Sequence, residues 1–468
     1  MESILWGIKD ECCARNMRLI KGEIMESKLN VLVYGDAVLC STGFSTVMKN
    51  LLRILYATGK YNFTCIGINH DGSPYDQKQF PYIIYPAVSP LSIDKVYNDV
   101  YGRQKTIDFA RTGQFDMIFL LNDTFIIETF LPTMLEMRSK MPKEKQFPII
   151  YYFPIDGEPK KTWIENVVAK VDFPVAYTEY AKRECLKHVP GLDRMPVIYH
   201  GVNKSTFYPL PAEEVDAFKK TFFPKHHDKF IVLNVNRNQP RKDLYRTFAA
   251  FKLFHDTNPD TFLFINAQAA DVGGNLLEIA EHYGLKYDED WACPSGSFNA
   301  NQGYPIQVVN QLYNACDMGI STTLGEGFGL SMVEFMATKK PIVFPNNTAI
   351  PEIVGSNEEY GYMCKSGETI NDWICLGTPD NNLLRPLTNV LDMADKMDYI
   401  YKHYDEAKVK AELAYERVWT WEQVGEQWKD VFNKADIKKR ILRGEIKPER
   451  NELCPCLSGE KFKHCCGR

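Results

Sequence analysis

Two glutamates, Glu326 and Glu334, flank a short glycine-rich turn in the stretch STTLGEGFGLSMVEFMA. Such a turn lets backbone N–H groups approach a ligand closely. If a helix begins near Gly327 to Leu330, its free N–H groups and its dipole favour an anion such as a diphosphate. Glu334, on that helix, can accept two hydrogen bonds from a ribose diol, while Glu326 faces a group beyond the phosphates. Taken alone, the pair would more commonly be a helix-start acid and a surface acid.

A basic turn supplies charge that would complement such an anion. The segment NRNQPRKD follows the apolar run FIVLNV, and α/β proteins bind ligands at the carboxyl ends of buried strands. Arg237, Arg241 and Lys242 can donate charge-assisted hydrogen bonds to two phosphates. The alternative interpretation is an ordinary basic surface turn.

Four cysteines lie in the last fifteen residues, CPCLSGEKFKHCCGR. Cys454, Cys456, Cys465 and Cys466 have the spacing C-x-C-x8-C-C, and four thiolates can hold one Zn²⁺ in tetrahedral geometry. Because so short a segment cannot form its own core, the metal would supply its folding energy. We expect His464 to be a neighbour of this structural site and not a ligand. The alternative is a set of four free or redox-active thiols.

The elements that must position these residues alternate between apolar strands and amphipathic helices. Candidate strands KLNVLVYGD, NFTCIGIN, FDMIFLLND and FPIIYYFPID are separated by helical patterns, and the series restarts with FIVLNVNR, TFLFINAQ and KKPIVFP. This alternation indicates α/β units with parallel sheets, and a cleft between two units is a favoured ligand site. We predict four parts, which are an α/β domain over 1–205, a second over 206–400, a helical region over 401–445 that packs back on the first domain, and a small knuckle over 446–468.

Composition and charge restrict the class of protein. Of 468 residues, 45% are hydrophobic and 25% are charged, as in a soluble globular protein. No apolar run reaches the roughly 18 to 20 residues that span a bilayer, and the start MESILWGIKDECC does not resemble a secretory signal. We therefore expect a cytoplasmic protein, in the host cytoplasm if the source is viral.

The charge is unevenly distributed. The net charge is -5, but Lys434–Arg468 holds ten basic and five acidic residues. This basic tail could contact DNA or another polyanion. A solvated, charged helix end is the alternative interpretation.

The order of the motifs resembles the retaining GT-B glycosyltransferases of the glycosyltransferase group 1 type, related to bacterial glycogen synthase and sucrose synthase. The resemblance rests on NRNQPRKD, ACDMGISTTLGEGFGLSMVEFMA and KKPIVFP…IPEIVG, with VIYHGVNKSTFYP similar to the hinge and YGDAVLCSTGFSTVMKNL to the N-terminal glycine loop. It implies two Rossmann-like domains that face a cleft, with the acceptor on the first and a nucleotide sugar on the second. The final cysteines resemble the SEC-C zinc motif of bacterial SecA and other proteins, where it contacts partners or nucleic acid.

The resemblance implies a role for each residue of the donor site. Arg237 and Lys242 would contact the donor diphosphate, Glu326 the sugar hydroxyls and Glu334 the ribose. Gly43, in the N-terminal loop, would close over the phosphates. Backbone amides would also contact phosphate or sugar, and they belong to Phe328, Gly329 and Leu330.

The resemblance also implies an acceptor-side acid and a metal-free catalytic site. Asp156, in YYFPIDGEP, occupies the position where relatives often carry a His or an acid near the acceptor, and the implied catalytic set is Glu326, Asp156, Arg237 and Lys242. The chain departs from the family at NNTAIPEIV, where Ala349 replaces a glycine. In YDED, Asp288 and Asp290 match the metal-binding Asp-x-Asp pattern of another glycosyltransferase fold, but we interpret them as an exposed acidic turn.

These features predict a retaining glycosyltransferase that moves a sugar from a nucleotide diphosphate sugar, UDP-linked by default, to a hydroxyl acceptor. One alternative is the same chemistry on hydroxymethylated bases of DNA, as in bacteriophage DNA modification. A second is a non-catalytic GT-B scaffold that recruits partners through the zinc tail, and a third is a sugar epimerase.

Overall fold

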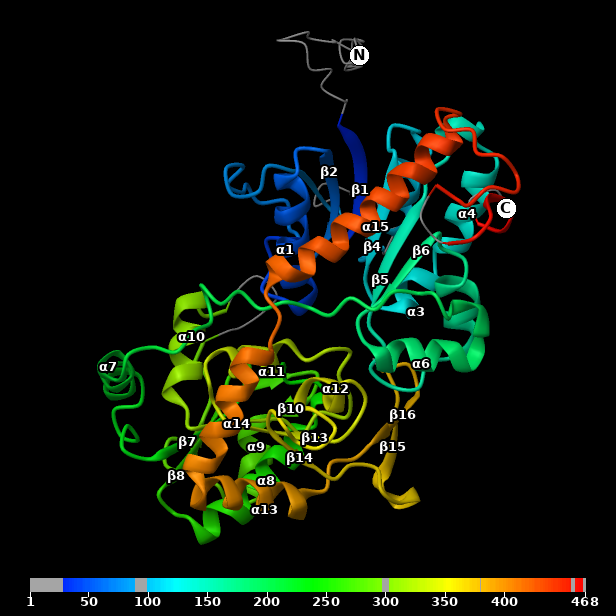
Figure 1. The fold of residues 1–468 in the computed structure, drawn as a ribbon. Coiled ribbons are helices and arrows are strands. Elements are labelled where there is room, and N and C mark those ends of the chain that lie inside the picture. Colours follow the sequence, from blue (N-terminus) through cyan, green and yellow to red (C-terminus); the bar gives the residue numbers. More distant parts are fainter. Residues whose placement is uncertain (1–27, 89–98, 297–302, 379, 456–458, 466–468) are drawn as a thin grey trace, which may run out of the picture.

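The computed structural model describes residues 28–88, 99–296, 303–378, 380–455 and 459–465, and these form two α/β lobes stacked one above the other (Figure 1). The first lobe contains a six-stranded parallel sheet of order β3-β2-β1-β4-β5-β6. Its strands are β1 (Leu29–Asp36), β2 (Tyr61–Ile68), β3 (Ile83–Pro86), β4 (Met117–Leu121), β5 (Ile149–Phe153) and β6 (Phe173–Ala176). Its helices are α1 (Gly43–Ala57), α2 (Arg103–Arg111), α3 (Thr124–Glu128), α4 (Leu131–Ser139), α5 (Lys161–Trp163) and α6 (Glu179–His188).

The second lobe repeats this strand order in a parallel sheet β11-β8-β7-β12-β13-β14. Its strands are β7 (Phe230–Asn234), β8 (Thr261–Ile265), β11 (Trp291–Ala292), β12 (Met318–Ile320), β13 (Ile342–Pro345) and β14 (Tyr362–Cys364). Two antiparallel pairs accompany it, β9 (Ala270–Asp271) with β10 (Gly274–Asn275) and β15 (Trp373–Leu376) with β16 (Leu383–Pro386). Its helices are α7 (Ala212–Phe222), α8 (Leu244–Thr257), α9 (Leu276–His282), α10 (Ile306–Ala315), α11 (Leu330–Ala337), α12 (Ile350–Val354), α13 (Val390–Lys402) and α14 (Tyr404–Arg417).

Continuous apolar runs explain the central strands. All five residues of β4, β5 and β8 are buried, as expected for parallel strands whose two faces are both covered by helices. These three strands and β1, β2, β7 and β13 confirm the strands predicted from the sequence. One apolar cluster extends from the α1 face of the first sheet to α10 and α11 of the second lobe, so the two lobes share part of their core.

The last long helix, α15 (Trp421–Leu442), returns to the first lobe, where it lies diagonally across the sheet (Figure 1). Trp428 is fully buried, and its ring lies 5.5 Å from Phe119 and 4.7 Å from Tyr152. Phe432 packs edge-on against Tyr61 at 5.3 Å. The preceding helix α14 stays with the second lobe, where it contacts α11 and α13. No helix within the described ranges is long and apolar enough to cross a membrane.

Basic residues of the tail hold α15 on the first lobe. The Lys438 ammonium lies 2.5 Å from Asp172, and Lys439, which is only 2% exposed, donates to the carbonyls of Glu144 and Gln146. Of the nine basic tail residues that the structure describes, Lys438, Lys439 and Arg443 bind the first lobe, and Lys434 and Arg440 pair with Asp430 and Glu445 nearby in the chain. These five cations therefore serve intramolecular packing, which removes part of the basis for a polyanion site on the tail.

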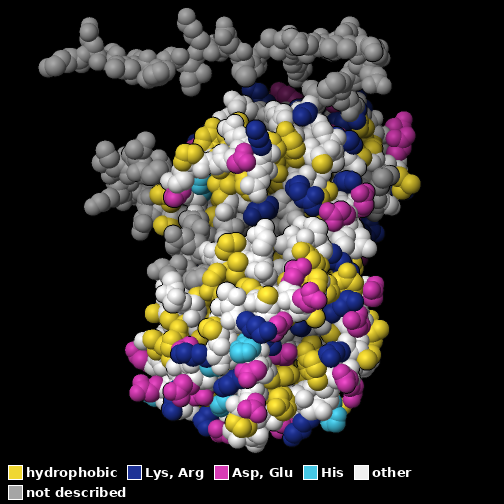
Figure 2. All heavy atoms as spheres, turned by 90° about the vertical axis from the view of Figure 1, so that its left-hand side faces the viewer, with side chains coloured by type: hydrophobic (Ala, Val, Ile, Leu, Met, Phe, Trp, Pro, Cys, Tyr) yellow, Lys and Arg dark blue, Asp and Glu magenta, His cyan; other side chains and the backbone are white. Residues whose placement is uncertain are grey.

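The surface of the second lobe has a mixed charge. Figure 2 shows Lys and Arg side chains interspersed with Asp and Glu over the lower lobe on the face in view. Opposite charges at this spacing reduce the attraction of a nucleic acid backbone, which binds best to a continuous basic surface. This face therefore gives no support to the expectation of DNA binding.

Two crossing segments join the lobes. Val202, on the outgoing segment, bridges Thr420 on the returning one, and the Val202 N–H donates to the Trp419 carbonyl at 2.8 Å. A Cβ atom on Gly201 would lie 2.4 Å from the Trp421 nitrogen, so only glycine fits where the segments cross. His200 is buried beside them, and burial lowers its pKa to about 3, which keeps the ring neutral.

The C-terminal segment after α15 contacts the first lobe through Glu460, whose carboxylate lies 2.8 Å from Arg194. Cys454 is buried, Cys465 is half-buried, and a bridge between Leu453 and Lys461 closes the loop between them. Cys456 and Cys466 lie outside the described residues. Over the residues that are described, no group of three or more metal-ligating side chains comes together. Zinc binding by these four cysteines stays a prediction.

Candidate functional site

The site begins at the carboxyl ends of β7 and β12, where the strand order of the second sheet reverses. Such a switch point leaves a crevice in which α/β proteins bind ligands. The Asn236 amide donates to the Ser321 hydroxyl at 3.1 Å and ties together the two segments that leave these strands. These segments carry the predicted residues Lys242 and Glu326.

Lys242 and Glu326 form an ion pair at the centre of the site. The Lys242 ammonium donates to Glu326 Oε1, and the two side chains are only 12% and 9% exposed. Burial lowers the pKa of Lys242, while the adjacent Glu326 carboxylate acts to raise it. The structure thus brings together a cation and an acid that the sequence separates by more than eighty residues.

Glycines bring the Glu326 loop against the first lobe. A Cβ atom on Gly325 would lie 2.0 Å from the Asp156 carbonyl oxygen, and one on Gly327 would lie 2.6 Å from Pro154 Cβ. Larger residues would push the lobes apart at both points. The glycines of the turn therefore allow the Glu326 loop to contact the segment that follows β5.

Asp156 is held between two guanidinium groups of the second lobe. Arg241 Nε lies 3.1 Å from one of its oxygens, and Arg385 Nη2 lies 3.1 Å from the other. Burial acts to raise the pKa of Asp156, but Arg385 and Arg241 hold it below its usual value. Arg385 comes from β16 and also pairs with Asp380 at 2.7 Å. Asp156 is therefore an ionised carboxylate that joins the two lobes through these two guanidinium groups.

The start of α11 lies against the start of α1 where the two lobes meet. A Cβ atom on Gly43 would lie 3.5 Å from Leu330 Cδ1, so the N-terminal loop meets the first residue of α11. Gly329 precedes the helix with φ +95°, a conformation that favours glycine, and Phe328 is buried beside it. The first N–H groups of a helix lack intrahelical acceptors, and here the N-termini of two helices come together where the lobes meet.

Glu334 lies one turn into α11 and is partly buried. Its Oε2 accepts a hydrogen bond of 2.6 Å from the Tyr313 hydroxyl on α10. Burial raises the pKa of Glu334 to about 7. Tyr313 was not predicted from the sequence, because its helical pattern marks it only as a core residue.

Arg237 does not join this cluster. Its side chain is 64% exposed, and it binds Asp271 through contacts of 2.8 and 3.3 Å. Arg241, four residues later, occupies the position beside Glu326 and Asp156. A role for Arg237 at a diphosphate requires its side chain to leave Asp271, and that role stays a prediction.

The structure shows why alanine fits at position 349, where the family that the sequence resembles has a glycine. Ala349 is buried with an ordinary φ of -82°. Thr348 takes the left-handed conformation at φ +46°, which costs roughly 1 kcal/mol for a residue with a side chain. Its hydroxyl accepts the Glu326 N–H at 2.8 Å, so the strained residue orients the Glu326 backbone.

The first lobe contributes two carboxylates that the sequence analysis missed. Asp36 ends β1, and Asp123 follows β4 as the N-cap of α3. Burial and the nearby Asp156 raise the pKa of Asp123 to about 7. The only sequence signal for either acid was its place directly after a predicted strand.

Asp288 and Asp290 lie away from these carboxylates, in the turn that precedes β11. Asp288 pairs with Lys225, and Asp290 lies 3.3 Å from His255. Both acids are therefore engaged with basic groups of the second lobe.

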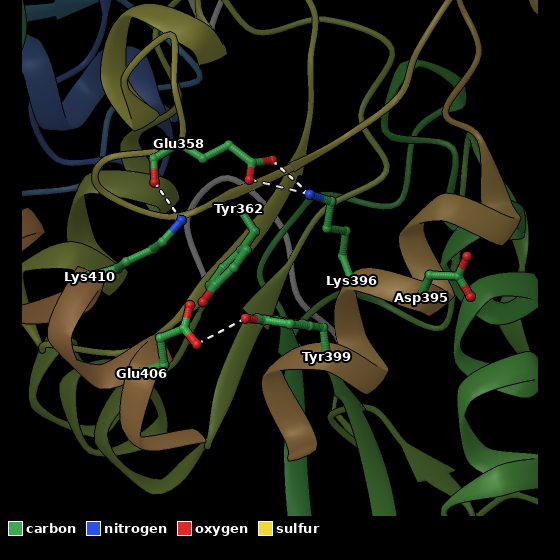
Figure 3. A pocket seen from close by; sticks show the side chains of 7 residues that line it. All are labelled: Glu358, Tyr362, Asp395, Lys396, Tyr399, Glu406 and Lys410. Atoms are coloured by element: carbon green, nitrogen blue, oxygen red, sulfur yellow. Dashed lines mark hydrogen bonds and ion pairs between the residues drawn. The ribbon is translucent and has the colours of Figure 1, made fainter. Parts of the chain in front are cut away.

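A cavity of about 380 Å³ lies between β14, α13 and α14 on the second lobe (Figure 3). Its polar groups largely satisfy one another. Lys396 binds Glu358 at 3.0 Å, Tyr399 donates to Glu406 at 2.9 Å, and Asp395 points away from the other side chains. It contains none of the predicted site residues, so the cleft remains the candidate site.

Comparisons with known proteins match the part of the chain that carries Glu326 and Glu334. Residues 301–374, which include Glu326 and Glu334, match the family model described as Glycosyl transferases group 1. Residues 450–468 match the SEC-C motif. SecA of Clostridium botulinum strain Hall is 38% identical over 60 residues, which is 13% of this chain and 7% of SecA. The chain thus spans a very small part of that curated relative.

Solved structures match over most of the chain. HepE from Anabaena, solved in complex with UDP and glucose, is 14% identical with a TM-score of 0.64, covering 86% of this chain and 99% of HepE. Sucrose-phosphate synthase from Thermosynechococcus elongatus is 14% identical with a TM-score of 0.65, covering 87% of this chain and 99% of the synthase. At these identities the likeness concerns the fold, and the chain has the two-lobed α/β architecture of GT-B glycosyltransferases.

Proposed function

We propose that this protein is a retaining glycosyltransferase that transfers a sugar from a UDP-sugar to a hydroxyl acceptor. The observation that carries the proposal is the Lys242–Glu326 pair beside the N-terminus of α11, within the segment that matches the glycosyltransferase model. HepE, which has the same fold, was solved with UDP-glucose. The donor would lie in the cleft, with its ribose at Glu334 and its sugar at Glu326.

The arrangement suits the charges that develop during transfer. The bond between the anomeric carbon and the phosphate oxygen breaks, and its electron pair leaves with the diphosphate. Lys242 and the first N–H groups of α11 can stabilise that negative charge without a metal, and Arg237 can add to it after leaving Asp271. A new bond forms to the acceptor oxygen, whose proton passes to a carboxylate of the first lobe. Asp123 is the candidate, because Asp156 already binds two guanidinium groups.

The first test is binding and turnover of the donor. Thermal shift with UDP-, GDP-, ADP- and TDP-sugars should show stabilisation by the UDP-sugars, because ligand that binds the folded state raises its stability. UDP-glucose without acceptor should be hydrolysed slowly, and NMR should show the α-anomer first if configuration is retained. A non-catalytic scaffold would give no turnover, and an epimerase would give a changed nucleotide sugar without release of UDP.

A matched pair of variants tests the central carboxylate. Glu326→Gln should lower turnover about 100-fold, the scale of losing one transition-state contact. It should leave UDP binding equal or tighter, because Lys242 is freed from its partner. Glu281→Gln, on the exposed surface of α9, should match the wild type in both measurements. Equal turnover in Glu326→Gln and the wild type would contradict the proposed role of Glu326.

We further propose that the SEC-C segment binds one structural Zn²⁺ through Cys454, Cys456, Cys465 and Cys466. The support is the motif match and the bridge between Leu453 and Lys461, which closes the loop that follows Cys454. Metal analysis should give about one zinc per chain, and Cys454→Ser with Cys465→Ser should abolish it. Cys375→Ser, at an exposed cysteine outside the segment, should retain the metal. Full zinc content in the double variant would refute this assignment.

A further inference from the structure

One hydroxyl holds the Glu334 carboxylate. Oε2 of Glu334 accepts the hydrogen bond of 2.6 Å from Tyr313, and this is the only hydrogen bond or ion pair that the carboxylate makes among the described residues. A glutamate side chain has several rotatable bonds, and fixing a mobile one when a ligand binds weakens the complex by about 10-fold. A partner that holds the carboxylate before the ligand arrives removes part of that loss. Tyr313 is such a partner.

Tyr313 is itself fixed in the core of the second lobe. It is fully buried, and the centroid of its ring lies 5.6 Å from that of Phe207 and 4.5 Å from that of Phe335, edge-on in both contacts. Phe335 follows Glu334 on α11, and Phe207 lies on the segment that leads into the second lobe. The direction of the Tyr313 hydroxyl is therefore set by packing on two sides of its ring.

The helix that carries Tyr313, α10, is anchored to the same segment. Asn314 donates to the Tyr208 carbonyl at 2.9 Å and accepts the Leu210 N–H at 2.8 Å. Asn310 accepts the Tyr208 N–H at 3.2 Å, and both asparagines are buried. Sites built on supported helices keep their geometry better than sites on loops. Helix α10 is thus a rigid support for the Tyr313 hydroxyl.

The ionisation of both groups fits this arrangement. Burial, together with the Glu334 charge, raises the pKa of Tyr313 far above its usual value, so its hydroxyl stays protonated and donates. Burial raises the pKa of Glu334, the Tyr313 hydrogen bond acts against that rise, and no charged side chain in the described part of the chain contributes. The hydroxyl therefore favours the ionised carboxylate, which is the form that accepts two hydrogen bonds from a ribose diol.

We propose that Tyr313 is a positioning residue for the donor, because its hydroxyl holds Oε2 of Glu334 in place and leaves Oε1 to accept the ribose diol in one orientation. The inference rests on the proposed function, which assigns the ribose to Glu334. Tyr313 acts through Glu334 and does not itself contact the donor. A phenylalanine at this position would keep the packing against Phe207 and Phe335 but would leave the carboxylate free to rotate.

The test compares nucleotides that differ only in the ribose. Calorimetry on the full-length protein at about pH 8, where Glu334 is mostly ionised, measures the binding of UDP and of 2′,3′-dideoxy-UDP, which lacks the diol. The wild type should prefer UDP by at least about 10-fold, and Tyr313→Phe should reduce this preference by about 5- to 10-fold, because the carboxylate loses its fixed orientation. Because the ratio is taken within one variant, a lower fraction of folded protein does not change it. Tyr399→Phe removes a matched hydroxyl on α13, which donates to Glu406 at 2.9 Å, and should keep the wild-type ratio.

A second background separates positioning from core packing. In Glu334→Ala, the further change Tyr313→Phe should leave the affinity for UDP unchanged, because the hydroxyl has no carboxylate to hold. With Glu334 present, Tyr313→Phe should move the tightening of UDP binding to higher pH, because the lost hydrogen bond no longer lowers the pKa of Glu334. Three results would each overturn the inference: equal binding of UDP and its dideoxy form by the wild type, an unchanged ratio or pH dependence in Tyr313→Phe, and the same loss of affinity with and without Glu334. A wild type that binds no nucleoside diphosphate refutes the proposed function itself, and the inference falls with it.

Discussion

At the scale of single residues, Glu326 is held by two cations from the segment that follows β7, Lys242 and Arg241. Glu326 and Lys242 were predicted from separate motifs and are in contact. Arg237 and Arg241 fit the pattern equally well, and only the folded chain shows that Arg241 lies beside Glu326 while Arg237 binds Asp271. Side-chain direction after a strand depends on the turn that follows, which sequence spacing does not determine.

The raised pKa of Glu334 predicts proton release when the donor binds. Burial raises the pKa to about 7, so near pH 6 the side chain is mostly protonated. A ribose diol that donates to the carboxylate favours the ionised form. UDP-glucose binding should therefore release protons near pH 6 and tighten as pH rises through about 7. Calorimetry in buffers of different ionisation enthalpy measures this release.

Glu334→Gln provides the control for proton release. The variant cannot ionise, so the release and the pH dependence of binding should both disappear. The same substitution changes stability. Between about pH 4.5 and 7, the Glu334 carboxyl is protonated in the folded chain but ionised in the unfolded chain. The free energy of unfolding of the wild type therefore falls as pH rises through that window, and in Glu334→Gln this fall should be absent. Proton release that persists in Glu334→Gln would assign the titration to another group.

At the scale of elements, hydrophobic periodicity predicted most of the central strands and long helices. β1, β4 and β5 are continuous apolar runs, and α15 carries Trp421 and Trp428 on its buried face. Short elements were missed. The hairpin of β15 and β16 is largely exposed on β15, so it shows no apolar pattern, yet it supplies Arg385 to Asp156. Tertiary contacts, not local preference, create such elements.

Burial of Trp428 should make α15 essential to the first lobe. Trp428→Ala should lower the free energy of unfolding by about 3–5 kcal/mol, because the fully buried ring leaves a cavity against Phe119 and Tyr152. Trp373→Ala, at a tryptophan that is 40% exposed, should cost much less. Chemical denaturation followed by circular dichroism measures both. Equal losses would mean that α15 packing contributes little to the stability of the first lobe.

A side chain at Gly201 should destabilise the crossing between the two lobes. Gly201→Ala places a Cβ atom 2.4 Å from the Trp421 nitrogen, so the two crossing segments must separate and α15 must shift. The melting temperature should fall, and the fluorescence of the buried tryptophans should move to longer wavelength. Gly191→Ala, which meets nothing within 4 Å, is the matched control. An unchanged melting temperature in Gly201→Ala would show that the crossing is not close-packed in solution.

At the scale of the whole molecule, charged contacts hold the two lobes together around the cleft. Asp156 joins Arg241 and Arg385 on one side. On the other, Glu352 of α12 accepts hydrogen bonds from the Glu179 and Tyr180 N–H groups at the start of α6 and from the Tyr199 hydroxyl. A carboxylate at a helix N-terminus is favourable. These contacts between lobes were not predictable from the sequence, because each joins residues that are distant along the chain.

The Glu352 contact should control how far the cleft opens. Glu352→Ala removes three hydrogen bonds between the lobes, each worth about 1 kcal/mol, and a longer ion pair with Arg183. This loss should shift the ratio of closed to open molecules by roughly 100-fold. The freed N–H groups of α6 gain water when the lobes part, so the melting temperature should change little. Small-angle scattering should show a larger radius of gyration, and the KM for the donor should rise because the open form must first close. Glu368→Ala, at an exposed acid of the second lobe that pairs with the nearby Lys365, should behave as the wild type. If Glu352→Ala and Glu368→Ala have the same radius of gyration, the closed form is held by the contacts of Asp156 and by the shared apolar core instead. The radius of gyration of the double variant Glu352→Ala/Arg385→Ala then measures the contribution of the Asp156 contacts.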